Sequence, residues 1–73
     1  MLGDQDMTWS ELRRIAMDNG WTFYRHGGNH DVYKKNGKRK NLVIERHWNQ
    51  EVRPGMMYKL FKIIYYDEGT RDN

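Results

Sequence analysis

The chain lacks cysteine altogether: none of its 73 residues is one. Secreted domains of this size usually rely on disulfides, so the composition favours a reducing compartment, and we expect a cytoplasmic protein. The same absence excludes a zinc site built on thiolates. No apolar run approaches the roughly 20 residues that a membrane-spanning helix needs, and the first residues lack the profile of a signal peptide. We therefore expect no membrane partner.

Aromatic residues, by contrast, make up 14% of the chain, and charged residues make up 32%. Because Trp and Tyr can build a small core, this composition is not that of a disordered chain. The length predicts one domain over residues 1–73, with a core at about 7–66, a loose leader at 1–6 and a solvated tail at 67–73. The net charge is +3, and the segment KKNGKRK at 34–40 concentrates positive charge, which favours a polyanionic partner.

Both ends of this core have helical patterns. A first helix is predicted at about 9–18, because Thr8 and Glu11 have the spacing of a capping box and apolar residues follow at helical intervals. Pro54 suits the first turn of a second helix, where its missing N–H leaves no hydrogen bond unmade. The apolar stripe of this second helix consists of Met57, Leu60, Phe61 and Ile64.

Three segments between the helices alternate as strands do: 21–26, 31–35 and 39–44. Gly27 and Gly28 end the first strand. Asn36-Gly37 between the second and third is a strong hairpin signal, since a type I′ turn needs positive φ at both central residues. Consecutive hairpins make an antiparallel meander.

The alternation also predicts which side chains face the core. Trp21 and Phe23 should share one face of the first strand, and Leu42 and Ile44 should point inward while Val43 points outward. The predicted fold is therefore α+β with the order α-β-β-β-α. A three-stranded antiparallel sheet would carry both helices on one face.

His30 is the strongest candidate for chemistry. Its imidazole can take or give a proton near neutral pH. It follows Gly27, Gly28 and Asn29, where we expect the glycines to serve backbone geometry, through positive φ or through close approach of the chain. It also precedes the basic segment 34–40, so we expect cations beside the imidazole.

Two neighbouring features have alternative interpretations. His26 lies four residues before His30, but a Gly-Gly turn is a poor frame for zinc and no further ligand completes a set, so we expect no metal and no other cofactor. Trp48 lies in a polar segment and is a candidate contact for RNA or for a protein partner, whereas Trp21 is expected in the core.

Several of these pieces resemble the HicA family of toxin ribonucleases from bacterial toxin–antitoxin systems, whose fold is of the double-stranded-RNA-binding type. The opening MTWSELRRIAMDNGW, the segment GGNH, the pair Arg46-His47 and the segment VRPGMMYKLFK are similar to that family in order and spacing. Together they cover about residues 7–64. The resemblance implies an mRNA interferase, an endoribonuclease that cuts mRNA and is silenced by a HicB-type antitoxin.

The resemblance implies that His30 is the catalytic residue. In a mechanism without a metal, His30 would act as general base on a ribose 2′-OH, and the 2′-oxygen would attack the adjacent phosphate. Nearby cations would neutralise charge building up on phosphorus. His47, a lysine or His30 itself could protonate the leaving oxygen. The residues expected to contact RNA are Lys34, Lys35, Arg39, Arg46 and His47.

Two non-enzymatic interpretations remain open. The chain could be an RNA-binding module of the same fold without catalysis, which would share the basic segment and differ only in the role of His30. It could also be a protein-interaction domain whose charge attracts an acidic partner. Cleavage of RNA by the purified protein, compared with a His30→Ala variant, separates these functions.

Overall fold

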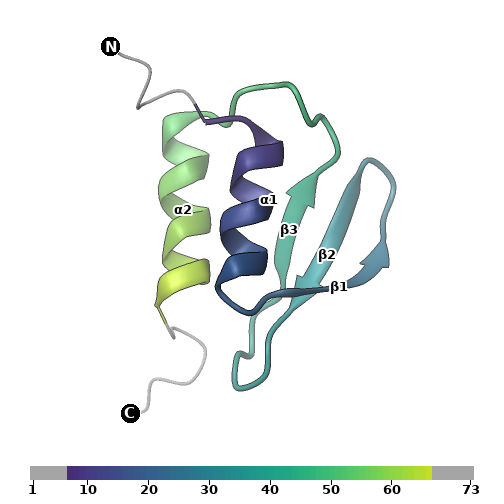
Figure 1. The fold of residues 1–73 in the computed structure, drawn as a ribbon, viewed down its shortest axis with the longest axis vertical. Helices are drawn as coiled ribbons and strands as arrows, with labels where there is room; N and C mark the ends of the chain where they lie inside the picture. The colour runs from purple at the N-terminus through teal and green to yellow at the C-terminus, as the bar shows by residue number, and fades with distance from the viewer. Residues whose placement is uncertain (1–6, 67–73) are drawn as a thin grey trace.

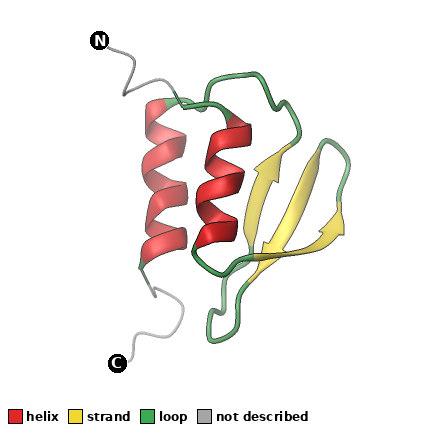
Figure 2. Cartoon of the chain, in the orientation of Figure 1, coloured by secondary structure: helices red, strands yellow, loops and turns green. Residues whose placement is uncertain are grey.

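The computed structural model describes residues 7–66, and the predicted leader and tail lie outside this range. The observed order of elements is α-β-β-β-α, as predicted. The elements are α1 (Trp9–Asp18), β1 (Thr22–His26), β2 (His30–Lys34), β3 (Leu42–Glu45) and α2 (Pro54–Tyr65). The two helices lie side by side and run in the same direction, with the sheet next to α1 (Figures 1 and 2).

Local sequence signals account for the start of α1. The backbone N–H of Glu11 donates to Thr8 Oγ1 at 3.2 Å, and the backbone N–H of Thr8 donates to Glu11 Oε1 at 3.0 Å. This is the predicted capping box, which satisfies two backbone donors that the first helical turn leaves without partners. At the other end the chain reverses through Gly20, whose φ of 94° favours glycine.

The three strands form one antiparallel sheet in the order β1-β2-β3. Each strand is displaced from its predicted bounds, and the third most of all, because it begins at Leu42 instead of residue 39. The turn at Asn36-Gly37 is present: the Lys38 N–H donates to the Lys35 carbonyl at 3.1 Å, and Gly37 has a φ of 84°. The paired parts of β2 and β3 do not reach this turn, however. Their pairing ends at Tyr33 and Leu42, so residues 34–41 form a longer connection and the expectation of a tight hairpin was wrong.

The first strand, β1, contains an irregularity that the alternation did not predict. The pairing with β2 shifts between Phe23 and Arg25, so Tyr24 is an extra, bulged residue. Trp21 precedes the strand and is fully buried, with its indole Nε1–H donating to the Ile64 carbonyl at 3.4 Å. Phe23 pairs with the buried Tyr33 and so lies on the helix-facing side of the sheet, as the alternation predicts, but at the sheet edge it stays 49% exposed and does not join the core.

Both helices pack on one face of the sheet, as predicted. Leu12 and Ala16 of α1 and Leu60 and Ile64 of α2 bury their side chains in one cluster with the inward residues of β3. Leu42 and Ile44 are those inward residues, and Val43 between them is exposed, as the alternation predicts. The opposite face of the sheet is not covered by either helix.

The segment between β3 and α2 is fixed to the start of α1. Backbone N–H groups of Trp9 and Ser10 donate to the carbonyls of Gln50 and Trp48, at 3.0 and 3.2 Å. Trp48 itself is partly buried against the core, and the Arg13 guanidinium lies 5.5 Å from the centre of its ring. The structure thus gives Trp48 a packing role. Within residues 7–66, no helix combines the length and the apolar character needed to cross a bilayer.

Candidate active site around His30

His30 is the first residue of β2 and lies opposite Glu45 of β3. Tyr33 is in the core, so the alternation along β2 puts His30, Val32 and Lys34 on the face that the helices leave open. The His30 carbonyl accepts a hydrogen bond from the Gly27 N–H at 2.7 Å, which closes the turn between β1 and β2. The imidazole is therefore attached at the rim of the open sheet face and is half-buried.

Gly27 is the surface against which the imidazole packs. A Cβ at this position would lie 2.4 Å from His30 Nε2 and 2.7 Å from its Cε1, a separation that real Cβ atoms essentially never show. Gly28 has no atom within 4 Å of the corresponding point. Neither glycine has a positive φ, so that part of the expectation was wrong. The expectation of close approach is confirmed for Gly27, where the approaching group is the His30 ring.

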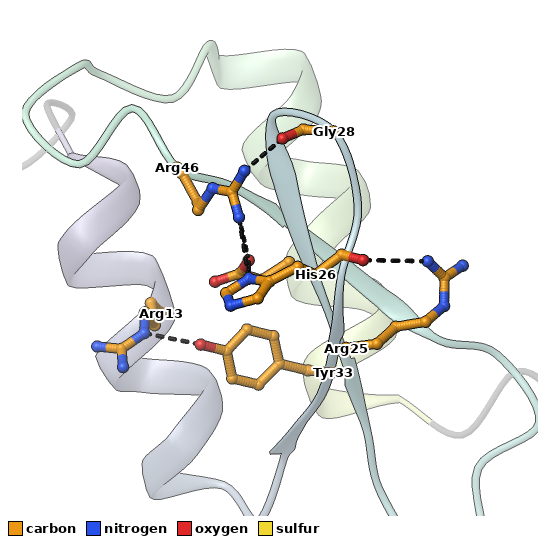
Figure 3. A network of polar contacts seen from close by, with 7 residues as sticks. Arg13, Arg25, His26, Gly28, Tyr33 and Arg46 are labelled. Atoms are coloured by element: carbon orange, nitrogen blue, oxygen red, sulfur yellow. Dashed lines mark hydrogen bonds and ion pairs between the residues drawn. The ribbon is translucent and has the colours of Figure 1, made fainter.

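Arg46 holds the turn that carries these residues. Its backbone N–H donates to the Asn29 carbonyl at 3.0 Å, and its guanidinium donates to the Gly28 carbonyl (Figure 3). A third bond runs from Nη1 to Asp31 Oδ1 at 3.1 Å. Arg46 was predicted to contact RNA; this role stays a prediction, and the structure adds that much of its donor capacity is used within the protein.

Asp31 is the buried centre of this network. Its side chain is only 7% exposed, and its Oδ1 lies 2.7 Å from His26 Nδ1 as well as close to Arg46. A buried carboxylate needs such partners, because an unpaired charge away from water is costly. His26 Nδ1 is within hydrogen-bond distance of both this carboxylate and Arg46 Nη1, the latter at 2.9 Å, and the His26 ring is otherwise 67% exposed.

Sequence reasoning missed this network. The sequence pattern indicates His26 only as a candidate metal ligand, and Asp31 only as a strand residue. The available signal was the Asp itself, since this residue type is disfavoured in strands unless its carboxylate is satisfied. His26 and Asp31 are also cross-strand partners.

The network has a neighbour on the same face of the sheet. The Tyr33 hydroxyl accepts a hydrogen bond from Arg13 Nε of α1 at 2.7 Å, which ties the central strand to the first helix (Figure 3). Phe23 packs edge-on against the Tyr33 ring and in a tilted arrangement against His26, with centroid separations of 6.0 and 4.9 Å. The helix-facing side of the turn is therefore held by both polar and aromatic contacts.

The basic segment lies at the other end of the central strand from His30. Lys34 ends β2, four residues after His30, so the two Cα atoms are ~13 Å apart at about 3.3 Å per residue. Residues 35–41 lead away from that end toward β3. The expectation that these cations flank the imidazole was therefore wrong, because an extended strand separates residues that are close in sequence. Roles in RNA binding for Lys34, Lys35 and Arg39 stay predictions.

His47 lies at the same end of the sheet as His30. It follows Glu45, the strand partner of His30, by two residues, and its Nε2 is 3.9 Å from Glu45 Oε1. Both side chains are about half exposed, so this ion pair contributes little to stability. Strand pairing thus brings His30, Arg46 and His47 to one end of the sheet, although Arg46 and His47 follow His30 by sixteen and seventeen residues. Within residues 7–66, no group of three or more His, Asp or Glu residues has the arrangement to hold a metal ion.

The chain matches a known protein family. A family model described as the HicA toxin of bacterial toxin–antitoxin systems matches residues 9–64. The matched segment runs from the first residue of α1 to the penultimate residue of α2, and it includes the turn, His30 and Arg46. No curated protein matched the chain, and no solved structure matched it either.

Proposed function

Because this match spans most of its length, the chain belongs to the HicA toxin family and is a toxin of a toxin–antitoxin system, and we propose that it acts as a metal-independent endoribonuclease, an mRNA interferase, with His30 as its general base. The observation that carries the proposal is the packing of the imidazole on Gly27. A surface histidine without a role needs no glycine beneath it. Here a side chain of even one carbon would displace the ring.

The proposed reaction uses the ribose 2′-OH as nucleophile. His30 removes the proton from this hydroxyl, the 2′-oxygen forms a bond to the adjacent phosphorus, and the bond from phosphorus to the 5′-oxygen breaks. The products are a 2′,3′-cyclic phosphate and a 5′-hydroxyl, so the step requires no metal and no other cofactor. General acid–base assistance of this kind is typically worth ~10²–10⁴ in rate.

The remaining roles follow from which groups share the His30 end of the sheet. Three candidates could protonate the leaving 5′-oxygen. The lysines of segment 34–40 are the least suitable, because the first of them lies ~13 Å from His30 along β2. His47 is at the right end of the sheet and half exposed, so we assign it this role. Arg46 keeps the turn in place and adds positive charge for the phosphate. Lys34, Lys35 and Arg39 would bind the RNA strand where it extends beyond the scissile bond.

A toxin of a toxin–antitoxin system has an antitoxin as its partner. We propose a HicB-type antitoxin that covers His30 and the basic surface and so prevents mRNA from entering. This assignment rests on family membership and on the exposure of the sheet face that carries His30. If the antitoxin and RNA compete for this surface, the antitoxin should bind the free toxin with substantially higher affinity than it binds the toxin–RNA complex.

Purified protein incubated with RNA in EDTA tests the enzymatic proposal. Wild type should cleave, whereas His30→Ala and the hydrogen-bonding control His30→Gln should not, although both variants keep the fold and most of the RNA affinity. An RNA with a single 2′-deoxyribose at the scissile position should be bound and left intact. Robust cleavage by His30→Ala, or cutting at the 2′-deoxy position, would refute the mechanism.

A non-catalytic RNA-binding module of this fold is the alternative function. One observation favours it: the densest positive charge lies away from His30, so binding does not depend on the imidazole. If it is correct, wild type and His30→Ala will bind RNA equally well and neither will cleave it. The same pair of proteins therefore decides between an enzyme and a binding module.

A further inference from the structure

The bulge in β1 creates a second candidate site on the open side of the sheet. Tyr24 is the extra residue of this bulge, and its ring is 54% exposed. The Lys34 ammonium lies 4.5 Å from the centre of the Tyr24 ring, a cation–π contact that fixes the ring beside a positive charge. Bulges commonly re-aim one side chain in this way near functional sites.

A surface hollow of about 380 Å³ lies at this place. Thr22, Phe23 and Tyr24 line it from β1, and Lys34, Lys35 and Asn36 line it from the end of β2. Its volume is within the usual range for sites that bind small ligands. The lining combines two aromatic rings, two ammonium groups and polar side chains, which matches the base, phosphate and sugar of a nucleotide.

Gly20 shapes the floor of the hollow. Its φ of 94° favours glycine, and a Cβ there would lie 3.2 Å from Cε of Lys35. The absence of a side chain therefore leaves room for the end of the Lys35 side chain, whose Cδ, Cε and Nζ all lie within 4 Å of that point, and both residues line the hollow. Among residues 7–66, neither Lys34 nor Lys35 forms an ion pair, so both charges are available to an anion.

We propose that this hollow binds one nucleotide of the single-stranded RNA, with its base stacked on Tyr24 and its phosphate held by Lys34 and Lys35. The proposal rests on the proposed function in that RNA is the ligand, and it adds where the strand runs. The hollow lies ~13 Å from His30 along β2, which is roughly four nucleotides at 3.4 Å per nucleotide of a stacked strand. The site would therefore serve affinity and the choice of cleavage position, and it would take no part in the chemical step.

Tyr24→Ala is the decisive variant, and Tyr58→Ala is its matched control. Tyr58 is another exposed tyrosine, on α2, and Lys62 lies 5.6 Å from the centre of its ring. Both substitutions remove an exposed ring with a lysine beside it and leave the core untouched. Binding is measured in a His30→Ala background with oligouridine of about ten nucleotides, which is longer than the roughly four nucleotides between the two sites. Turnover is measured in the wild-type background, once with this RNA and once with a dinucleotide.

Tyr24→Ala should weaken binding of the long RNA by about 5- to 150-fold, the range for loss of one stacked base, and Tyr58→Ala should not. The KM for the long RNA should rise without a comparable fall in kcat, and turnover of the dinucleotide should be unchanged. Equal losses on both substrates, unchanged affinity for the long RNA, or weakened binding of the antitoxin alone would each overturn the proposal. Because binding is measured without cleavage, a wild type that never cleaves but loses affinity through Tyr24→Ala would sink the ribonuclease and leave this site standing.

Discussion

Replacing Gly27 by alanine is the most direct test of how His30 is positioned. The added Cβ would be 2.4 Å from Nε2 of the imidazole, against ordinary contacts of 3.4–4 Å, so the ring has to move by about 1 Å or leave its position. Gly28→Ala is a control of the same chemistry one residue later, because a Cβ there meets nothing within 4 Å. Neither glycine has a positive φ, so alanine is compatible with the backbone at both positions.

The expected size of the effect follows from this geometry. A displacement of about 1 Å at a reacting group can lower a rate ~10²-fold, and we expect a loss of this order in cleavage by Gly27→Ala. If the ring stays and is strained, the free energy of unfolding should also fall by ~1–3 kcal/mol, as for other overpacked sites. If the ring moves to another rotamer, stability is spared and cleavage is still lost.

Single-turnover cleavage of a defined RNA measures the first effect, and urea unfolding measures the second. Gly28→Ala should resemble wild type in both assays. In a His30→Ala background the clash is gone, so the Gly27→Ala change should no longer affect stability, which gives a double-mutant cycle that does not depend on RNA cleavage. Cleavage by Gly27→Ala at the rate of Gly28→Ala would refute the idea that Gly27 positions the imidazole.

Three further outcomes test the fold, the buried network and the basic segment. Leu60→Ala should lower the free energy of unfolding by ~2–5 kcal/mol, because it opens a cavity between α2 and the sheet; an unchanged urea midpoint would contradict the packing of both helices on one face. Arg46→Met should lower the free energy of unfolding by about 3 kcal/mol, the low end of the range for a broken buried ion pair, because Arg46 is 33% exposed. The loss should be smaller in an Asp31→Asn background. Equal effects in the two backgrounds would mean that Arg46 and Asp31 do not interact. Simultaneous replacement of Lys34, Lys35 and Arg39 by alanine should reduce the slope of log K for RNA binding against log salt concentration by up to ~2, at about 0.7 for each phosphate contact to a single strand. An unchanged slope would mean that the RNA binds to another surface.

Much of the fold was predictable because its determinants are local. The capping box of Thr8 and Glu11 fixes where α1 begins, and the alternation of Leu42 and Ile44 with Val43 fixes the inward face of β3. Strand ends were less predictable. Whether a residue pairs with a neighbouring strand depends on the residue that it faces there. The alternation of apolar and polar residues in β1 does not indicate the bulge at Tyr24.

The candidate site divides in the same way. The order of Gly27, Gly28 and His30 indicated a special turn, and family resemblance indicated the role of the imidazole. The partners around it depended on the tertiary structure. Antiparallel pairing brings Arg46 against Asp31 and Gly28, whereas an extended strand carries Lys34 ~13 Å from His30 at about 3.3 Å per residue. Sequence separation alone therefore predicted the wrong cations beside the imidazole, since distance in a sheet is set by pairing between strands as much as by position along one of them.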